Sequence, residues 1–480
     1  MNSITDFLDL EDDNLKIDDI SISGTTKTIT ISTEAYPHFC PSCQGRMYSR
    51  GIKKRTIQHP ILQDHYKVVI ILKQRRWRCT NASCGYESNE EFHFVNARRR
   101  TTNATDMLIV QAFRDFSVSA SEIARRFTTS DTHVTEIFDR YVHLDRLLLP
   151  EIISIDEVNV DLDSKCKYAL IIQDFVTGDP VDLLFSRRSE VTEPYFTNIP
   201  IEERSRVKYL ISDMYKPYIN YVTKYFPNAS SVVDAFHVVQ WMNSRIDNYI
   251  RSLVRQYKTR DTQNYLAKHP EGLPEGAKPP LSDELYLLTR YRWLILQSQA
   301  NITYHSDARM DKHFRALMNT YDYEDALFRL SPRLHTLRDL KEKYLYFNSA
   351  NAGKPDTART ELDKLIEEYK SCGDSIFIDF AHTLECYKDS IINSFIMVKK
   401  FGNGKMYDSR LSNGPMESLN RIPKDMKRNG RGYTNPEHFR NRFLYATRNN
   451  PVLNGTGRSE YTCYDMSDDL AITQEDKDEQ

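Results

Sequence analysis

The strongest constraint on the fold of this chain is the placement of three acidic residues that lie far apart in the sequence. Asp156 follows the apolar segment 152–155, and Asp213 follows the segment 207–212. Both segments are typical of buried strands, here ending on a carboxylate. Glu417 follows an asparagine, a glycine and a proline, a pattern that favours the first turn of a helix. Two strand-end aspartates and a helix-borne glutamate are suited to binding two divalent ions for phosphodiester chemistry.

The order of predicted elements around the two aspartates indicates a mixed sheet. Three strands at 152–156, 168–173 and 181–185 are separated by short connections, which favours antiparallel pairing. A helix, the strand that ends at Asp213, a second helix and a strand at 231–234 follow. This is the order of an RNase-H-like core, which places the acid of the first strand beside that of the fourth.

The long interval between Asp213 and Glu417 predicts a domain inserted into that core. Apolar residues recur there at three- and four-residue spacing, which is typical of helices. The expected helices cover residues 285–302, 327–347, 360–369 and 376–398. We therefore expect an all-helical insertion.

Two close cysteine pairs predict a structural zinc site made of Cys40, Cys43, Cys79 and Cys84. The spacings C-x2-C and C-x4-C lie within the range of zinc ligands. The pairs are followed by Gly45 and Gly85, which permit a tight turn with positive φ. Four free cysteines in a core are the alternative interpretation. His38 and His93 are alternative ligands, although a solvated histidine is the simpler interpretation for each.

Residues 104–148 have the pattern of a helical domain with a helix-turn-helix. Segment 121–127 has the apolar spacing of a short helix, and residues 128–130 form a turn. A second helix begins at Asp131, and in such a motif it enters the major groove of DNA. A plain helical bundle is the alternative, and the basic zinc domain beside it favours DNA binding. The exposed candidates for base contact are Thr132, His133, Thr135 and Glu136.

Positive charge is concentrated in two segments, although the formal net charge of the chain is only −2. Residues 46–100 hold 13 lysines or arginines against 4 acids, and residues 421–448 hold 8 against 2. Basic blocks in a near-neutral chain indicate a phosphate-rich partner such as DNA. For Arg187 a solvated side chain is an equally good interpretation. The candidate phosphate contacts are Arg98, Arg99, Arg100, Arg187, Arg421, Lys424 and Arg428.

The chain has no feature of a secreted or membrane protein. No apolar run approaches the roughly 18 residues of a membrane-spanning helix. The N-terminal segment is acidic and lacks a basic region followed by an apolar one, so secretion is not expected. Eight cysteines in so long a chain do not form a disulfide framework. We expect a cytoplasmic protein without a membrane partner.

Two motifs carry a family resemblance. The first contains Ser212-Asp213-Met214, Tyr218, Phe226-Pro227-Asn228-Ala229 and Asp234-Ala235-Phe236-His237. The second contains Ser412-Asn413-Gly414-Pro415-Met416-Glu417-Ser418-Leu419-Asn420, Lys427-Arg428 and Gly432-Tyr433. With the zinc and helix-turn-helix segments, the chain resembles a DDE transposase of the bacterial ISL-three insertion-sequence family. It departs from the family at Ser418, where glycine is usual, and at Pro423, which should kink or end the helix of Glu417.

The resemblance implies a DNA transposase of the bacterial cytoplasm, associated with the nucleoid. Such an enzyme binds the terminal inverted repeats of its element on double-stranded DNA, cuts with Mg²⁺ or Mn²⁺ and joins the freed end to target DNA. Asp156, Asp213 and Glu417 would be the catalytic metal ligands, and a homodimer or higher oligomer would act on DNA. Asp234 and His237 are candidate auxiliary residues, for which a structural role at a helix start is an equally good interpretation. A regulator without catalysis and a nuclease without strand transfer remain alternatives.

These patterns predict a multidomain α+β fold. The expected order is an acidic tail (1–18), a zinc-binding domain (19–98), a helix-turn-helix domain (99–149), the first part of an RNase-H-like core (150–250), an all-helical insertion (251–404), the final core helix with Glu417 (405–450) and an acidic tail (451–480). We expect both tails to be solvated and disordered because each is rich in acids.

Overall fold

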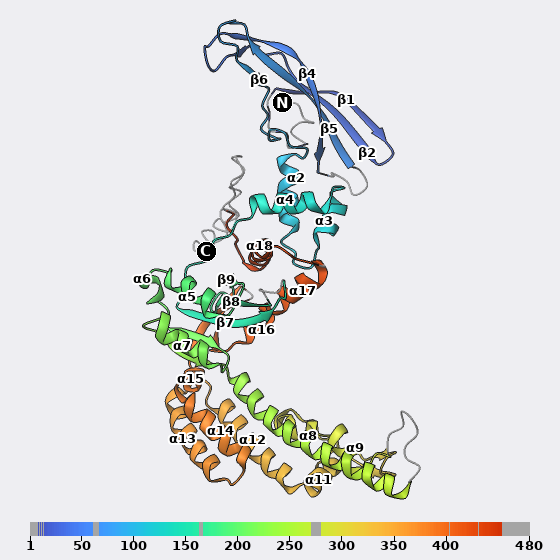
Figure 1. Ribbon diagram of the computed structural model, residues 1–480, viewed down its shortest axis with the longest axis vertical. Coiled ribbons are helices and arrows are strands. Elements are labelled where there is room, and N and C mark those ends of the chain that lie inside the picture. The colour runs from blue at the N-terminus through green and yellow to red at the C-terminus, as the bar shows by residue number, and fades with distance from the viewer. Residues whose placement is uncertain are drawn as a thin grey trace, which may run out of the picture.

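The computed structural model describes residues 14–60, 67–162, 167–269, 280–402, 404–430 and 432–453, together with Leu8, Leu10 and Asp12. Within these residues the chain has a mixed α+β architecture, with two large sheets, two small hairpins and many helices. The parts follow one long axis (Figure 1). The N-terminal sheet lies at one end, short helices and a central sheet lie in the middle, and a helical region lies at the other end.

The N-terminal region is a six-stranded sheet. Five strands have the order β1-β2-β5-β4-β3, and β6 pairs with β5. Its strands are β1 (Leu15–Ser23), β2 (Thr26–Thr33), β3 (His38–Phe39), β4 (Arg46–His59), β5 (Lys67–Cys79) and β6 (Glu87–Asn89). Strands β1 and β2 form an antiparallel hairpin, which turns at Gly24 with a φ of 59°. Alternating residues such as Ile29, Ile31 and Ile70 form the core on one face of this sheet.

The expected acidic tail at residues 1–18 is wrong in part. Strand β1 already begins at Leu15, and Leu8 and Leu10 are buried in the core of the N-terminal sheet. Burial of these leucines stabilises the segment despite the acids between them. The rest of that tail, and residues 454–480 of the C-terminal tail, lie outside the described residues.

Three helices follow the N-terminal sheet, namely α2 (Asn103–Ala112), α3 (Ala120–Arg126) and α4 (Asp131–Tyr141). The hydroxyls of Ser119 and Ser130 cap α3 and α4 by accepting hydrogen bonds from the backbone N–H groups of Glu122 and His133. The turn between the two helices contains Thr128 with a φ of 48°. Helix, turn and helix therefore occupy the segments that their apolar spacing predicts.

The central sheet has the strand order β11-β10-β7-β8-β9. Its strands are β7 (Ile152–Asn159), β8 (Tyr168–Asp174), β9 (Pro180–Leu184), β10 (Tyr209–Ser212) and β11 (Ser230–Val233). Strands β7, β8 and β9 pair antiparallel, whereas β10 is parallel to both β7 and β11. One face packs against α5 (Ser189–Thr197), α6 (Ile201–Arg204) and α7 (Lys216–Tyr225) through a core that includes Phe196 and Tyr225.

The C-terminal helices lie on the other face of this sheet and join it to the helix-turn-helix. They are α16 (Gly414–Leu419), α17 (Arg421–Gly430) and α18 (Pro436–Thr447). A single apolar cluster contains Ile123 and Phe138 of the helix-turn-helix, Ile171 of β8, and Phe439 and Phe443 of α18. The helix-turn-helix therefore shares its core with the central sheet.

The region between β11 and α16 is mostly helical, but the prediction that it is all-helical is wrong. It contains two antiparallel hairpins, β12 with β13 and β14 with β15. The segment expected to be helical to residue 398 instead ends as a helix at Asn393 and continues as β14, whose burial alternates weakly. The elements are α8 (Ala235–Lys268), α9 (Asp283–Arg290), α10 (Trp293–Leu296), η1 (Gln299–Asn301), β12 (Arg309–Asp311), β13 (Ala316–Met318), α11 (Thr320–Leu330), α12 (Pro332–Ala350), α13 (Pro355–Ser371), α14 (Ser375–Cys386), α15 (Lys388–Asn393), β14 (Met397–Gly402) and β15 (Lys405–Arg410).

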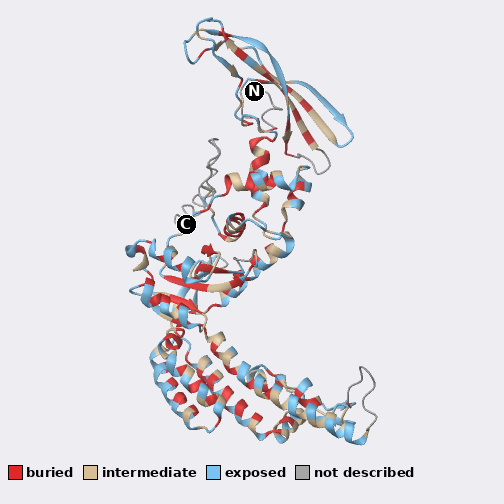
Figure 2. Cartoon of the chain, in the orientation of Figure 1, coloured by how far each residue is buried: buried red, intermediate tan, exposed pale blue. Residues whose placement is uncertain are grey.

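Figure 2 shows buried residues in every region along the axis. In the helical region they form one large core that includes Leu334, Tyr344 and Phe380. This core also includes Val233 of β11, so the helical region packs against the central sheet. No helix in the described part of the chain is long and apolar enough to cross a membrane.

Candidate active site and metal centres

Asp156 lies within strand β7, which corrects the prediction that it ends a strand. The strand continues to Asn159 because its antiparallel pairing with β8 extends to the pair of Asn159 with Tyr168. Side chains alternate along a strand, so Asp156 shares a face with Ser154 and Val158. Helices α16 and α17 pack against β7.

Asp213 directly follows β10, as predicted, and is aligned with Asp156. In the parallel pairing of β10 with β7, Ile211 lies opposite Ser154. Continuing this register by two residues brings Asp213 opposite Asp156. Neighbouring strands are about 4.8 Å apart, so the two aspartates lie side by side near the centre of the sheet.

Helix α16 brings two asparagines to these aspartates. The Nδ2 atom of Asn420 donates a hydrogen bond to Oδ2 of Asp156 at 2.6 Å. The Nδ2 atom of Asn413 lies 3.5 Å from Oδ1 of Asp213. Glu417 lies between the two asparagines in sequence, in the first turn of α16, and its side chain is exposed. The third acid of the predicted triad is thus on the helix that contacts the other two.

The three acids do not form a closed cluster in this structure. Among the residues that the structure describes, they are not a group whose ligand atoms all lie within 4.8 Å of one another. Like charges repel, and Asp156 and Asp213 are paired with neutral or basic side chains instead. The carboxylates are nevertheless hard oxygen ligands of the kind that Mg²⁺ and Mn²⁺ prefer. This donor set fits a divalent ion held by Asp156 and Asp213, with Glu417 as a further ligand from α16.

Burial, and after it the negative charge of Asp213, raise the pKa of Asp156 to about 6. The backbone N–H of Glu157, which donates to Oδ1 of Asp156 at 2.7 Å, and the amide of Asn420 favour the ionised form. The carboxyl group therefore ionises late, and a divalent cation at this position would promote its ionisation.

His237 is a basic side chain in contact with Asp213. Its Nε2 atom lies 2.6 Å from Oδ1 of Asp213. Burial lowers the pKa of His237, but the hydrogen bond and charge of Asp213, with the charge of Asp234, outweigh burial and raise the pKa overall. Asp234 itself is buried and caps helix α8 by accepting a hydrogen bond from the N–H of Phe236. Asp234 thus has a structural contact, whereas His237 touches a member of the triad.

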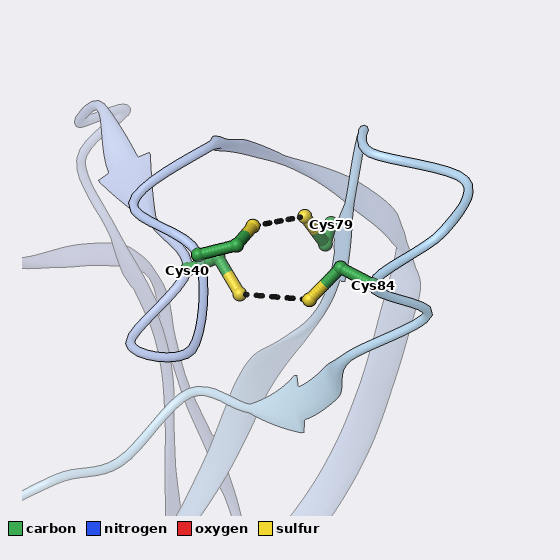
Figure 3. Close-up of side chains that lie close together, drawn as sticks. Cys40, Cys79 and Cys84 are labelled. Atoms are coloured by element: carbon green, nitrogen blue, oxygen red, sulfur yellow. Dashed lines mark hydrogen bonds between the residues drawn. The ribbon is translucent and has the colours of Figure 1, made fainter.

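The four cysteines meet, as their spacing predicts. Their sulfur atoms all lie within 4.8 Å of one another (Figure 3). The Sγ atoms of Cys40 and Cys84 are 3.7 Å apart, and those of Cys43 and Cys79 are 3.4 Å apart. Four sulfurs at about 2.3 Å from a central zinc would be separated by about 3.8 Å. The arrangement therefore fits a tetrahedral structural zinc.

The two turns at the cysteine cluster differ from the prediction in one detail. Gly85 has the expected positive φ of 61°, but in the first turn the positive φ of 60° belongs to Gln44. At Gly45 a Cβ atom would lie 3.3 Å from Sγ of Cys43, which is a tight contact, and 3.6 Å from Sγ of Cys79, which is an ordinary one. Burial raises the pKa of Cys79 to about 12, while the N–H of Tyr86 lowers that of Cys84 to about 7.

Comparisons with known proteins identify the family of the chain. A model of the ISL3 group of DDE transposases, described as "Transposase", matches residues 153–443. The match covers more than half of the chain and contains all three acids. The chain belongs to this transposase family. It is also 22% identical over 426 residues to the transposase for insertion sequence element IS1001 from Bordetella parapertussis, across 87% of this chain and 90% of that protein.

The family match begins at β7 and ends in α18, so it leaves the cysteine cluster and helices α2, α3 and α4 outside. In α4, Thr132 and Glu136 are exposed, and His133 and Thr135 are half-buried. Thr132 and His133 border a hollow of about 390 Å³ that Gln58 and Arg100 also line. The N-terminal end of α4 and strand β4 of the N-terminal sheet therefore border the same hollow.

The predicted phosphate contacts of this transposase-family chain fall into two groups. Exposed side chains belong to Arg98, Arg100, Arg421, Lys424 and Arg428, whereas Arg99 is half-buried. Pro423 lies in the first turn of α17, and the predicted break comes earlier, at Asn420 between α16 and α17. The positive face of α17 is therefore separate from the helix that carries Glu417.

Arg187 has a partner that the sequence did not indicate. Its guanidinium contacts the carboxylate of Glu157 at 2.6 Å, and the hydroxyl of Tyr218 donates to the same carboxylate at 2.6 Å. The hydrogen bond with Glu157 raises the pKa of Arg187. Glu157 directly follows Asp156 in β7, so its side chain lies on the opposite face of the sheet. Arg187 therefore contacts the face that is turned away from Asp156, and the charge of Glu157 balances its own.

Proposed function

We propose that this chain is a catalytically active DNA transposase that cuts DNA at the ends of its insertion sequence and joins them to target DNA. The observation that carries the proposal is the alignment of Asp156 and Asp213 on neighbouring parallel strands, with the helix of Glu417 hydrogen-bonded to Asp156. The family match over the same residues supports the transposase activity.

The strand order of the central sheet supports an RNase-H-like catalytic core. Three antiparallel strands followed by two parallel ones, with the acids on β7 and after β10, is the arrangement that the sequence order predicts. When bound, Mg²⁺ or Mn²⁺ would polarise the phosphodiester and promote loss of the proton from the attacking water or hydroxyl. Asp156 and Asp213 would hold and orient the ion, and Glu417 would be a further ligand from α16.

DNA binding is assigned to the N-terminal half. The zinc sheet and the exposed end of α4 would contact the terminal inverted repeats, with α4 in a major groove and Arg98 and Arg100 on phosphates. Arg421, Lys424 and Arg428 on α17 would hold DNA near the cut. Two element ends must be processed together, so we propose that a homodimer or higher oligomer acts on DNA.

The proposal is tested with the full-length protein, duplex DNA carrying the element's ends, target DNA, and Mg²⁺ or Mn²⁺. Strand mapping should find nicks at the element ends and covalent joining of the 3′ ends to target DNA. Cutting without joining would identify a nuclease of the same fold. Binding of the ends without any cutting, with either ion, would identify a regulator that has lost catalysis.

A further inference from the structure

We propose that Asn420 and Asn413 are positioning residues of the metal site, which hold Asp156 and Asp213 in the orientation that a divalent ion requires. The inference rests on the proposed function and adds two residues to it. It begins with the location of the two side chains. Asn413 precedes α16 and Asn420 ends it, so both approach the aspartates from the two ends of the helix that carries Glu417.

The first observation is that Asn413 does not serve its own helix. An asparagine at a helix N-cap normally accepts a hydrogen bond from the backbone with its Oδ1 atom. Asn413 occupies the N-cap of α16 without such a bond, and its Nδ2 atom is directed at Asp213 instead. The side chain is fully buried, so solvent does not explain its orientation.

The second observation is that both amides have an unpartnered oxygen. Among the described residues, the Oδ1 atoms of Asn413 and Asn420 are buried without a hydrogen-bond partner. Asn420 is 8% exposed, yet only its Nδ2 atom is engaged, with Asp156. Leaving a buried acceptor unsatisfied is unfavourable for folding. Two such oxygens beside two carboxylates indicate a site built for a ligand rather than for stability.

The third observation explains how the amides act. Oδ1 of Asp156 accepts the N–H of Glu157 and Oδ2 accepts the amide of Asn420, so both oxygens of this carboxylate are fixed in direction. Side chains that orient metal ligands through hydrogen bonds typically change metal affinity by about 10- to 100-fold when removed. The short bond of Asn420 predicts the larger effect, and the 3.5 Å separation at Asn413 predicts a smaller one.

The test compares Asn420→Leu, Asn420→Ala and Asn413→Leu in the full-length protein, with Ser418→Ala as the control on the exposed side of α16. Leucine branches at the same atom as asparagine, so it keeps the shape of the side chain and removes the amide, which in Asn420→Leu leaves Oδ2 of Asp156 without that donor. A melting curve of each variant checks that it is folded, and the affinity of the folded protein for Mn²⁺, not its stability, distinguishes a positioning role from a purely structural one. Calorimetric titration with Mn²⁺ should show about tenfold weaker binding for Asn420→Leu and Asn420→Ala. Ser418→Ala should bind as wild type does.

Cleavage assays give the second readout. Asn420→Leu should need about tenfold more Mn²⁺ for half-maximal cleavage and should recover most of its rate at saturating Mn²⁺. Unchanged Mn²⁺ affinity and unchanged Mn²⁺ dependence in a folded Asn420→Leu protein would overturn the inference while wild-type cleavage still supports the proposed function. If wild type binds Mn²⁺ but never cuts, the proposed function fails, and the titration alone decides the role of Asn420.

Discussion

The pairing of Asp156 with Asp213 places two like charges beside each other in a partly buried site. His237 balances Asp213, and hydrogen bonds from Glu157 and Asn420 balance Asp156. The charge of Asp156 is nevertheless disfavoured, as its raised pKa shows. A raised pKa at a carboxyl group beside a second carboxyl group is common at functional sites, and it accords with the proposed role of Asp156 as a metal ligand.

This balance predicts a pH-dependent stability. The pKa of Asp156 in the folded protein is about 6, above its ordinary value of 3.8. Its contribution to stability is thus complete below about pH 4 and is lost as the pH rises through 6, by at most about 3 kcal/mol. Without added magnesium, the melting temperature of Asp156→Asn minus that of wild type should be larger at pH 7.5 than at pH 4.5. If this difference in melting temperature is the same at the two pH values, the electrostatic account is contradicted.

The positions of these residues could be predicted from sequence more readily than their partners. Asp213 and the cysteines stand beside local signals, namely an apolar strand and close pair spacing. The contacts of Asn420 with Asp156 and of Arg187 with Glu157 join residues far apart in the chain. No periodicity marks such pairs, because they depend on how the helices pack on the sheet.

At the scale of elements, the zinc cluster joins the β3–β4 turn to the end of β5. The full-length protein should contain one zinc per chain by elemental analysis, and Cys79→Ser should abolish it because the site then has three ligands. Gly45→Ala should bind zinc more weakly, since the added Cβ atom would press on Cys43. A strong chelator should unfold the N-terminal sheet, measured by circular dichroism. A sheet that keeps its signal after complete zinc removal would contradict a structural role.

Helix α18 connects the helix-turn-helix with the central sheet. Arg442 is fully buried, donates to the backbone carbonyls of Asp115 and Val118, and lies over the ring of Phe113. Arg442→Ala should lower the free energy of unfolding by about 2–4 kcal/mol, because it leaves a cavity and unsatisfied carbonyls. Urea titration measures this, with the exposed Arg428→Ala as control. Equal stability of the two variants would show that α18 does not support the helix-turn-helix.

Elements with strong local patterns were predicted well, and short ones were not. The apolar spacing of α3 and α4 is complete within a few residues. The strands β12 and β13 have only three residues each and little burial, so they have no period to detect. Helix α18 packs on α3 and α4, and this contact joins the two helices to the core of the central sheet.

At the scale of the whole molecule, the N-terminal sheet and the central sheet lie at different positions along the long axis (Figure 1). Cys79 ends β5 of the first sheet, and Asp156 lies in β7 of the second. Binding of DNA ends and cleavage should therefore be separable by mutation. A change that removes one carboxylate at the central sheet leaves the zinc cluster, α4 and the helical region untouched. The proposed catalytic centre predicts loss of chemistry with retained binding.

The most direct measurement is cleavage and joining of end-containing DNA in Mg²⁺ by Asp156→Asn, Asp213→Asn and Glu417→Gln. Each variant keeps the size of the side chain and removes the charge that holds the ion. Each should lose at least about 100-fold in cleavage rate, while binding to the ends in a gel-shift assay stays within about twofold of wild type. Asp234→Asn, at the cap of α8, is the matched control and should still cut. Cleavage by Asp213→Asn together with its loss in Asp234→Asn would contradict the assignment of the catalytic acids.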